Sequence, residues 1–316
     1  MITSTQIASM MNITPLRVKQ LVWDSDLPVV KSSAKSRTIF PHSTVRKLLQ
    51  SRGFKFDKTI ATIGQEKGGV GKSLLSFNVA VNMAQRGAKV LIVDLDPESC
   101  LTNILLTEED LNNEFGTVYH CLKDNLQFKD VAQATRYEGV DIVGCKGLAR
   151  RADRLVADGN PKKILSKHME GLEEYDLILF DVPPTFTRLI SSAYLTSDIV
   201  VMPTFPDAWS IESLQLTIDD INDDCEQFDS EKPEIKILMN KYRSDRTASK
   251  EAWNTLSKEF GQYLLPFQIK ESAHLQNLVN EGLSLFEKGS NKDIKEAFIS
   301  VCDILCPVNS EKQLDQ

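Results

Sequence analysis

The sequence predicts an α/β protein whose doubly wound, mostly parallel sheet is preceded by a small, largely helical domain. From residue 59 onward, short apolar and β-branched runs alternate with stretches of helical periodicity, as in parallel strands joined by crossover helices. A glycine-rich loop separates the first such run from the helix after it. The first 58 residues instead combine two short helical patterns with an excess of basic residues. We therefore expect domains at residues 1–52 and 59–306, a linker at 53–58 and a flexible tail at 307–316.

The composition is that of a globular protein with an ample core. Of the 316 residues, 41% are apolar and 26% are charged, which are ordinary values for such proteins. The chain contains no apolar run long enough to span a bilayer, and its first residues lack the pattern of a signal peptide, so we expect a cytoplasmic protein. The six cysteines have no metal-ligand spacing, and we expect them to be reduced thiols.

The net charge of −7 is distributed unevenly. Residues 1–58 contain ten Lys or Arg, three Asp and no Glu, which gives +7, and the remainder therefore carries −14. A basic domain on an acidic body suggests that the first domain contacts nucleic acid. The alternative is that the basic residues serve only solubility.

Two short helices are predicted within residues 3–23. Thr3 and Gln6 have the spacing of a capping box at the start of the first helix. Thr14 is a suitable N-cap for the second helix, and Pro15 suits its first position. Apolar residues at helical spacing would pack the two helices against each other, which leaves polar and basic residues on the outer side of the second helix.

The rest of this domain has the pattern of a wing. Two β-like runs, at residues 27–30 and 38–40, flank a segment rich in serine and basic residues, and a closing helix is expected over residues 43–51. This order resembles the MerR-like winged helix-turn-helix, in which the second helix enters the major groove and the wing contacts phosphates. The alternative is a helical hairpin used only for dimerisation. On the first interpretation, the DNA-binding residues are Arg17, Lys19, Gln20, Lys35 and Arg37.

The glycine-rich loop lies between a predicted strand at residues 59–63 and a predicted helix at 74–86. In this context, backbone N–H groups and a helix N-terminus bind phosphate. Lys72 would reach the β- and γ-phosphates, and the Ser73 hydroxyl would be a Mg²⁺ ligand. The alternative is a turn that binds no nucleotide. The predicted nucleotide-binding residues are Lys67, Gly68, Gly69, Val70, Gly71, Lys72, Ser73 and Leu74.

A second lysine at the start of this loop makes it unusual. Lys67 follows Glu66, where the generic phosphate loop has glycine. The loop thus resembles the deviant Walker A motif of the ParA/MinD class of ATPases, and the residue before Lys67 is polar, as is usual in the ParA branch. In that class the first lysine reaches across a dimer interface to the partner's nucleotide. The resemblance therefore implies a homodimer that forms with ATP.

Two further apolar runs end in carboxylates. The first ends with Asp94 and Asp96, and the second ends with Asp181 followed by Val-Pro-Pro. These endings resemble the remaining Walker motifs of the same class. The resemblance implies that Asp96 orients or activates the attacking water, with Lys67 and Lys72 as the other catalytic residues, and that Asp94 and Asp181 join Ser73 around Mg²⁺. For Asp96, the alternative is an ordinary strand end capped by acids.

The last third of the chain supplies further candidates. Asn240 ends a predicted strand where related folds place an asparagine against the base, and residues 264–267, with Pro266, resemble the family's base-side loop. Ordinary strand ends are the alternative for both. The stretch after Asn240 resembles a ParA segment whose arginine binds DNA without sequence preference, which makes Arg243, Arg246 and Lys250 DNA-binding candidates. Basic residues also recur at 150–167, where a solvated helical face is favoured over a DNA-binding one.

Together, these resemblances imply a ParA-type partition ATPase that serves a plasmid or a chromosome. Such a protein uses ATP and Mg²⁺, binds DNA as a dimer, is stimulated by a ParB-like partner and associates with the nucleoid; the first domain adds operator binding and autorepression. The last residues lack the basic amphipathic membrane helix of MinD relatives, so we expect no membrane partner. The alternative is a DNA-binding transcriptional regulator that senses ATP with little turnover. An electron-transfer relative resembling the nitrogenase iron protein would need paired cluster cysteines, which the cysteine spacing does not provide.

Overall fold

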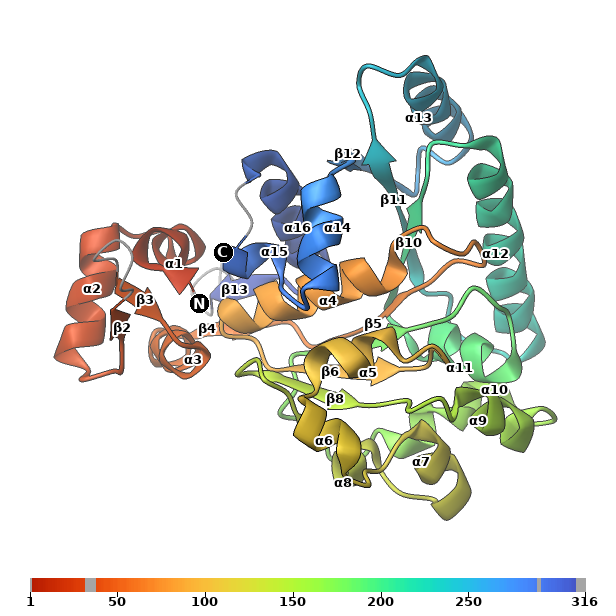
Figure 1. Cartoon of the computed structure of the whole chain (residues 1–316), viewed down its shortest axis with the longest axis horizontal. Coiled ribbons are helices and arrows are strands. Elements are labelled where there is room, and N and C mark those ends of the chain that lie inside the picture. Colours follow the sequence, from red (N-terminus) through yellow and green to blue (C-terminus); the bar gives the residue numbers. More distant parts are fainter. Residues whose placement is uncertain (1, 32–37, 289–290, 311–316) are drawn as a thin grey trace.

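The computed structural model describes residues 2–31, 38–288 and 291–310, and an eight-stranded sheet lies at the centre of this part of the chain (Figure 1). The strand order is β12-β11-β10-β5-β9-β6-β8-β7, and all neighbours are parallel except β7 and β8. This is the predicted doubly wound, mostly parallel sheet. The strands are β5 Thr59–Ile63, β6 Val90–Asp94, β7 Gln133–Ala134, β8 Val140–Val143, β9 Leu177–Asp181, β10 Ile199–Thr204, β11 Glu234–Tyr242 and β12 Leu264–Lys270.

Helices cover both faces of the sheet, and each face has its own apolar core. Strands buried on both sides need no polar alternation, which is why their sequences are nearly continuous apolar runs. The helices over one face are α4 Lys72–Gln85, α5 Cys100–Leu105, α6 Glu108–Asn112, α14 Ala273–Asn280, α15 Leu285–Lys288 and α16 Lys292–Leu305. Those over the other face are α7 Val118–Asp124, α8 Phe128–Val131, α9 Ala149–Val156, α10 Pro161–Ile164, the 3₁₀ helix Ser166–His168, α11 Arg188–Thr196, α12 Ala208–Gln227 and α13 Thr247–Glu259.

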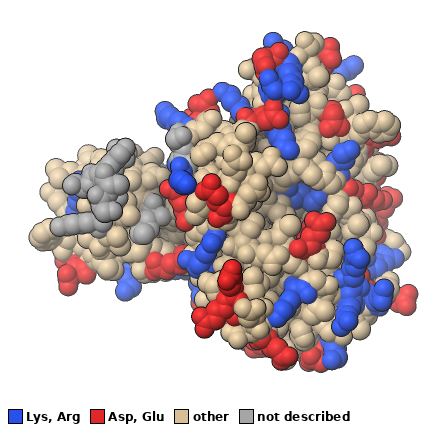
Figure 2. Space-filling model, viewed as in Figure 1, with Lys and Arg blue, Asp and Glu red and all other residues tan. Residues whose placement is uncertain are grey.

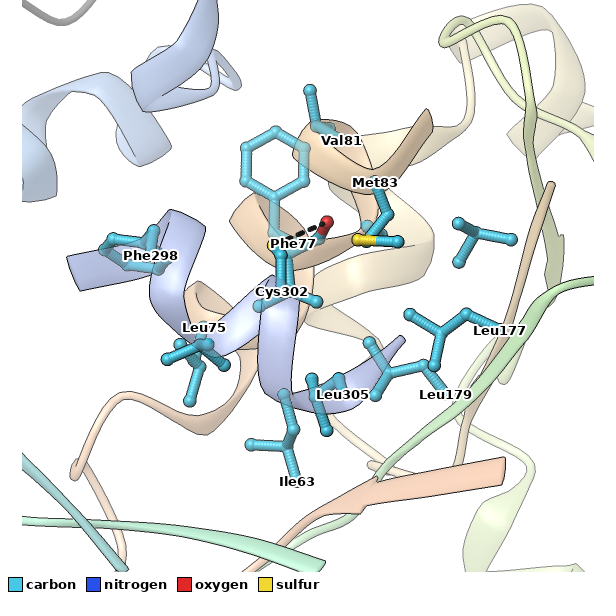
Figure 3. Close-up of a cluster of buried hydrophobic side chains, with 14 of the residues drawn as sticks. Ile63, Leu75, Phe77, Val81, Met83, Leu177, Leu179, Phe298, Cys302 and Leu305 are labelled. Carbon is cyan, nitrogen blue, oxygen red and sulfur yellow. Dashed lines mark hydrogen bonds between the residues drawn. The ribbon is translucent and has the colours of Figure 1, made fainter. Parts of the chain in front are cut away.

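Helix α4 is buried on nearly all sides, between the sheet and α16 (Figure 3). Phe298 and Leu305 of α16 lie against this helix and the sheet, and the Cys302 thiol lies 3.8 Å from the carbonyl oxygen of Val79. A helix in such a central position is expected to be apolar over most of its surface. The helix that follows the glycine-rich loop is therefore held rigidly in the core.

The first domain lies to one side of the sheet and has a separate apolar core (Figure 1). Helices α1 and α2 are joined by a three-residue turn, and their N-caps are the predicted Thr3 and Thr14; the Oγ1 atom of Thr14 accepts a 3.2 Å hydrogen bond from the Arg17 backbone N–H. A three-stranded antiparallel sheet of order β1-β3-β2 and a third helix complete it. Its elements are β1 Ile2–Thr3, α1 Ser4–Met11, α2 Pro15–Asp24, β2 Val30–Lys31, β3 Thr38–Phe40 and α3 His42–Ser51.

The segment expected to be a linker and part of the expected flexible tail pair with each other. Strand β4, Phe54–Phe56, is antiparallel to β13, Val308–Ser310. Phe54 and Phe56 also pack against the core of the first domain. The prediction of a flexible tail is therefore wrong for Val308–Ser310, because backbone pairing with a segment some 250 residues earlier holds these residues. Residues 311–316 lie outside the described part.

Helix α3 joins the first domain to the body. The Arg46 guanidinium donates a 3.0 Å hydrogen bond to the Gly87 carbonyl oxygen and forms an ion pair with Asp176. The His42 ring nitrogen Nε2 lies 3.1 Å from the carbonyl oxygen of Ala88. These contacts lie in the loops just before β6 and β9, at the edge of the sheet opposite to the carboxyl ends of the strands. The first domain therefore docks at the far end of α4 from the glycine-rich loop.

In residues 2–31, 38–288 and 291–310, no helix combines the length and the apolar character needed to cross a bilayer.

Candidate active site

A cavity of about 1160 Å³ opens at the carboxyl ends of the parallel strands. Ligands of open α/β sheets bind at this edge, and the volume is ample for a nucleotide. The loop between β5 and α4 forms one wall, with Gly68, Gly69, Gly71, Lys72, Ser73 and Leu74 among the lining residues. Asp96, which follows β6, and Asn240, near the end of β11, also line it.

The glycines of the loop have conformations that other residues rarely adopt. Gly69 and Gly71 have φ of +75° and +94°, in the left-handed region that favours glycine. A Cβ on Gly71 would lie 2.5 Å from the Nδ2 atom of Asn240. That Asn240 amide donates a 2.9 Å hydrogen bond to the carbonyl oxygen of Val70, which is buried behind the loop. Asn240 therefore borders the cavity, and its described contact is with the phosphate loop; a contact with the base stays a prediction.

Lys72 lies at the start of α4, and its ammonium is turned into the loop. The Nζ atom donates to the backbone carbonyl oxygens of Gln65 and Lys67, each at 3.0 Å. Burial lowers the pKa of Lys72, while the charges of Asp181 and Asp96 act in the opposite direction. The loop thus holds a cation whose present partners are neutral carbonyls, so phosphate oxygens would be stronger partners.

Asp181 ends the central strand β9 and lies fully buried behind the loop. Its two carboxylate oxygens accept hydrogen bonds from the hydroxyls of Ser73 and Ser76, each at 2.7 Å. Burial raises the pKa of Asp181 to about 7; the charge of Asp94 adds to this effect, and the two serines oppose it. A hydroxyl and a carboxylate side by side are the hard oxygen ligands that Mg²⁺ prefers, so Ser73 and Asp181 fit such an ion.

Asp94 and Asp96 have different environments although they are two residues apart. Asp94 is fully buried and accepts hydrogen bonds from the Thr102 N–H (3.0 Å), the Thr102 hydroxyl (2.6 Å) and the Asp96 N–H (3.1 Å). Burial raises the pKa of Asp94 to about 6, and the Thr102 hydrogen bonds oppose the shift. Asp96 lines the cavity and accepts one hydrogen bond at 2.9 Å, from the Glu98 N–H. The structure therefore brings Asp96 to the cavity, whereas Asp94, predicted near the metal, is not among the lining residues.

Lys67 and Glu66, at the start of the loop, lie beside the cavity and not on its lining. Within the described residues, the Lys67 ammonium has no hydrogen-bond or ion-pair partner, and the side chain is half-buried. Burial, together with the neighbouring carboxyl group of Asp220 of α12, raises the pKa of Glu66. The Lys67 ammonium is thus available to contact a bound group.

Pro266 is not a cavity residue. It belongs to the edge strand β12, in a part of the strand where the pairing with β11 is irregular, as is usual for proline within a sheet. The prediction of a loop at residues 264–267 is therefore wrong. Residues 270–273 line the cavity instead, as do residues 183–185 after β9. Both sets follow a strand at the carboxyl edge, so the strand order could have indicated them.

The predicted DNA-binding residues that the structure describes lie on α2 and near the start of α13. Arg17, Lys19 and Gln20 are exposed on α2, as expected for its outer side. Near α13, Arg246 and Lys250 are exposed without an ion pair to any described residue. Arg243 lines the cavity and is paired with Asp245 (2.7 Å) and Glu271 (3.5 Å). Lys35 and Arg37 lie outside the described residues.

The sequence of this chain is similar to a protein-family model and to several known proteins. A family model described as "AAA domain" matches residues 57–237. Cell division protein PomZ of Myxococcus xanthus is 26% identical over 233 residues, which cover 71% of this chain and 72% of PomZ. Sporulation initiation inhibitor protein Soj of Bacillus subtilis is 33% identical over 158 residues, which cover 49% of this chain and 61% of Soj. The chain thus matches less than two thirds of the length of Soj.

The fold is also similar to solved structures. Apo McdA of Cyanothece superposes with a TM-score of 0.69 at 21% identity, over 78% of this chain and 98% of McdA. At this level of identity, the likeness concerns the fold. It shows that the central sheet and its helices are arranged as in McdA.

Proposed function

We propose that this chain, which belongs to the AAA domain family, is a ParA-type P-loop ATPase that hydrolyses ATP, with Mg²⁺, in the service of DNA partition; its similarity to Soj supports the proposal. One observation carries the proposal: Lys72, Ser73, Asp96 and Asp181 come together at the carboxyl edge of the sheet, on and directly behind one cavity of nucleotide size. The cofactors are ATP and Mg²⁺.

In the proposed reaction, the phosphate loop binds the triphosphate through its backbone N–H groups and through Lys72. The ammonium exchanges the carbonyl oxygens of Gln65 and Lys67 for phosphate oxygens. Mg²⁺, when bound, neutralises phosphate charge, and Ser73 and Asp181 would hold it. Asp96 has a carboxylate at the cavity with a single described hydrogen bond, so it can orient the attacking water and accept its proton.

The proposed active form is a homodimer that forms with ATP. Lys67 supports this proposal, because its ammonium lacks a partner within the described part of its own subunit. In the dimer, Lys67 would contact the phosphates bound by the other subunit and so add positive charge where negative charge develops.

The proposed ligand of the dimer is DNA. Arg246 and Lys250, with Arg243 beside them, would contact phosphates without sequence preference, and a ParB-like partner would stimulate hydrolysis. The first domain would act as a winged helix-turn-helix, because α2 follows α1 after a short turn and exposes Arg17, Lys19 and Gln20. It would bind an operator, with Lys35 and Arg37 in the wing, and so allow autorepression in a nucleoid-associated protein.

A second candidate function is that of an ATP-sensing transcriptional regulator with little turnover. The contacts of Arg46 and His42 with Gly87 and Ala88 favour it, because they connect the first domain to the end of the helix that begins at Lys72. Steady-state ATP hydrolysis, measured with and without duplex DNA and with the partner from the same gene cluster, tests the two candidates. The ATPase proposal predicts that DNA and partner together increase turnover, whereas turnover that stays near zero under all conditions favours the regulator.

A further inference from the structure

Helices α9 and α10 carry a basic surface that lies apart from the DNA-binding residues proposed above. Figure 2 shows Lys and Arg side chains gathered over these helices, in the lower right of the view. Residues 149–167 contain six basic and two acidic residues, a net +4, within a body that carries −14 over residues 59–316. The α9–α10 face consists of Arg150, Arg151, Arg154, Lys162, Lys163 and Lys167, all exposed.

The local sequence explains why these side chains point outward. Ala149 and Ala152 are buried, so α9 lies close to the body through its small residues. Arg151 and Arg154 are three positions apart and therefore share the opposite side of the helix. Pro161 begins α10, and the Asn160 side chain caps it by accepting a 3.0 Å hydrogen bond from the Lys162 N–H.

The cations of this face are not neutralised by the protein. None of the six forms an ion pair with an acidic residue in the described part of the chain; the Lys162 ammonium donates to the Asp229 carbonyl oxygen. Of the two acids nearby, Asp153 accepts a 2.6 Å hydrogen bond from the Thr187 hydroxyl. Exposed cations left unpaired in an otherwise acidic body indicate a surface for a polyanion.

We propose that the α9–α10 face binds the phosphate backbone of duplex DNA, as a second contact surface in addition to that of Arg246 and Lys250. The inference rests on the DNA binding proposed above and extends it to a new site. A lipid surface fits less well, because membrane-binding helices bury a broad apolar face, whereas among the large apolar side chains of α9 and α10 only Leu155 is exposed.

The position of this face relates it to the nucleotide site. Arg150 and Asp153 of α9 line the cavity, and so does Thr187, which hydrogen-bonds to Asp153 and caps α11. DNA bound across α9 would therefore lie next to the segment that follows Asp181. The six cations can neutralise phosphates without contacting bases, so the binding would be independent of sequence.

The test is the salt dependence of DNA binding by the full chain with ATP and Mg²⁺. The variant Arg151→Gln, Arg154→Gln removes two exposed cations that lie outside the nucleotide cavity. Each neutralised phosphate contributes about −0.9 to the slope of log affinity against log salt, so we expect the slope to become shallower by about 2. When NaCl rises from 50 to 200 mM, the affinity of both proteins for DNA should fall, and the factor by which it falls should be roughly tenfold smaller for the variant than for the wild type. Fluorescence anisotropy of labelled duplexes of two unrelated sequences gives this slope.

A matched control variant removes two positive charges outside the α9–α10 face. In the variant Lys232→Gln, Lys288→Gln, both lysines come from ion pairs, with Glu226 at 3.1 Å and Glu281 at 3.2 Å. Its slope should equal that of the wild type, and both variants should keep the DNA-free ATP turnover of the wild type.

The outcomes separate this inference from the proposed function. A wild-type chain that binds no DNA with ATP overturns both. A wild-type chain that binds DNA, together with an Arg151/Arg154 variant of unchanged slope, overturns only the α9–α10 surface. The α9–α10 DNA surface is also overturned if the Arg151/Arg154 variant keeps the wild-type salt slope of DNA binding but no longer binds vesicles of anionic lipid. That result would favour a membrane surface.

Discussion

At the scale of single residues, the difference between Asp94 and Asp96 shows what decides the role of a carboxylate. Three donors surround Asp94, whereas Asp96 has one and borders the cavity. A buried acid with every donor in place contributes to the fold. An acid with free acceptor positions beside a ligand cavity is available for chemistry. Two similar positions in one motif therefore differ in the number of donors around the carboxylate and in access to the cavity.

The first prediction concerns Asp96. Asp96→Ala should leave ATP affinity within about threefold of the wild type but reduce turnover by about 10²–10³, because it removes a group that acts on the attacking water. Isothermal titration with ATP and a phosphate-release assay measure the two quantities. Turnover equal to the wild type would remove Asp96 from the mechanism.

Asp94→Ala is the informative comparison for that variant. The substitution leaves the Thr102 hydroxyl and N–H without their acceptor, so it should lower the free energy of unfolding by about 2 kcal/mol or more. Urea unfolding of the nucleotide-free protein measures this. We expect Asp96→Ala to unfold like the wild type in the same experiment.

The second prediction concerns Lys72. Lys72→Ala should weaken ATP binding by about 2–3 kcal/mol, which is roughly 30- to 150-fold, because charge-assisted hydrogen bonds to phosphate are lost. Binding of a fluorescent ATP analogue measures the effect. The exposed Lys250, substituted in the same way, should leave the affinity unchanged, and equal affinities for all three proteins would refute the assignment of the phosphate loop.

At the scale of elements, helix α4 connects the nucleotide site to the core. It begins with Lys72 and Ser73 at the cavity and ends beside α3 of the first domain. Its apolar surface is covered by the sheet and by α16 (Figure 3). Because α4 is packed on all sides, its position depends on the fit of its neighbours. The position of the phosphate loop therefore depends on the packing of α4 against its neighbours.

The third prediction follows from that packing. Phe298 of α16 is fully buried against α4, so Phe298→Ala should reduce the free energy of unfolding by about 3–5 kcal/mol. Urea unfolding monitored by circular dichroism measures it. Lys292→Ala, at an exposed position of the same helix, should cost less than about 0.5 kcal/mol; similar losses in the two variants would contradict the packing described here.

At the scale of the whole molecule, the contact between the first domain and the body contains a titratable group. Burial lowers the pKa of His42 below its ordinary value, with Arg46 acting in the same direction and Glu138 and Asp176 opposing it. A histidine whose pKa is lower in the folded than in the unfolded state stabilises the fold fully at pH values above its unfolded pKa. This stabilisation is lost as the pH falls from the unfolded pKa through the folded pKa. The docking of the first domain should therefore weaken in acid.

The fourth prediction tests that effect. Between pH 8 and pH 5, the melting temperature of the wild type should fall more than that of His42→Gln, because the variant has no ring to protonate. Differential scanning calorimetry at four pH values measures the difference. His274→Gln, at an exposed position of α14, should keep the wild-type dependence, and parallel curves for wild type and His42→Gln would exclude the buried histidine as the cause.

Sequence alone predicted a mostly parallel sheet, the phosphate loop and the strands that carry Asp94, Asp181 and Asn240, but it did not predict strand β12. These features depend on local patterns: glycine where φ is positive, apolar runs that end in acids, and caps such as Thr14 beside Pro15. Each is set by residues within a few positions of one another, so a single pass along the chain detects them. The order of these patterns then restricts a parallel sheet to few topologies.

Only the tertiary structure decided which partner each of these residues has. Asn240 contacts Val70, Pro266 joins an edge strand, and Val308–Ser310 pair with Phe54–Phe56. That the basic residues of α9 and α10 have no acidic partners can also be known only from the positions of the Asp and Glu side chains in the folded chain. In each case, the deciding contact joins residues far apart in sequence, and its free energy depends on burial and geometry that no local pattern encodes.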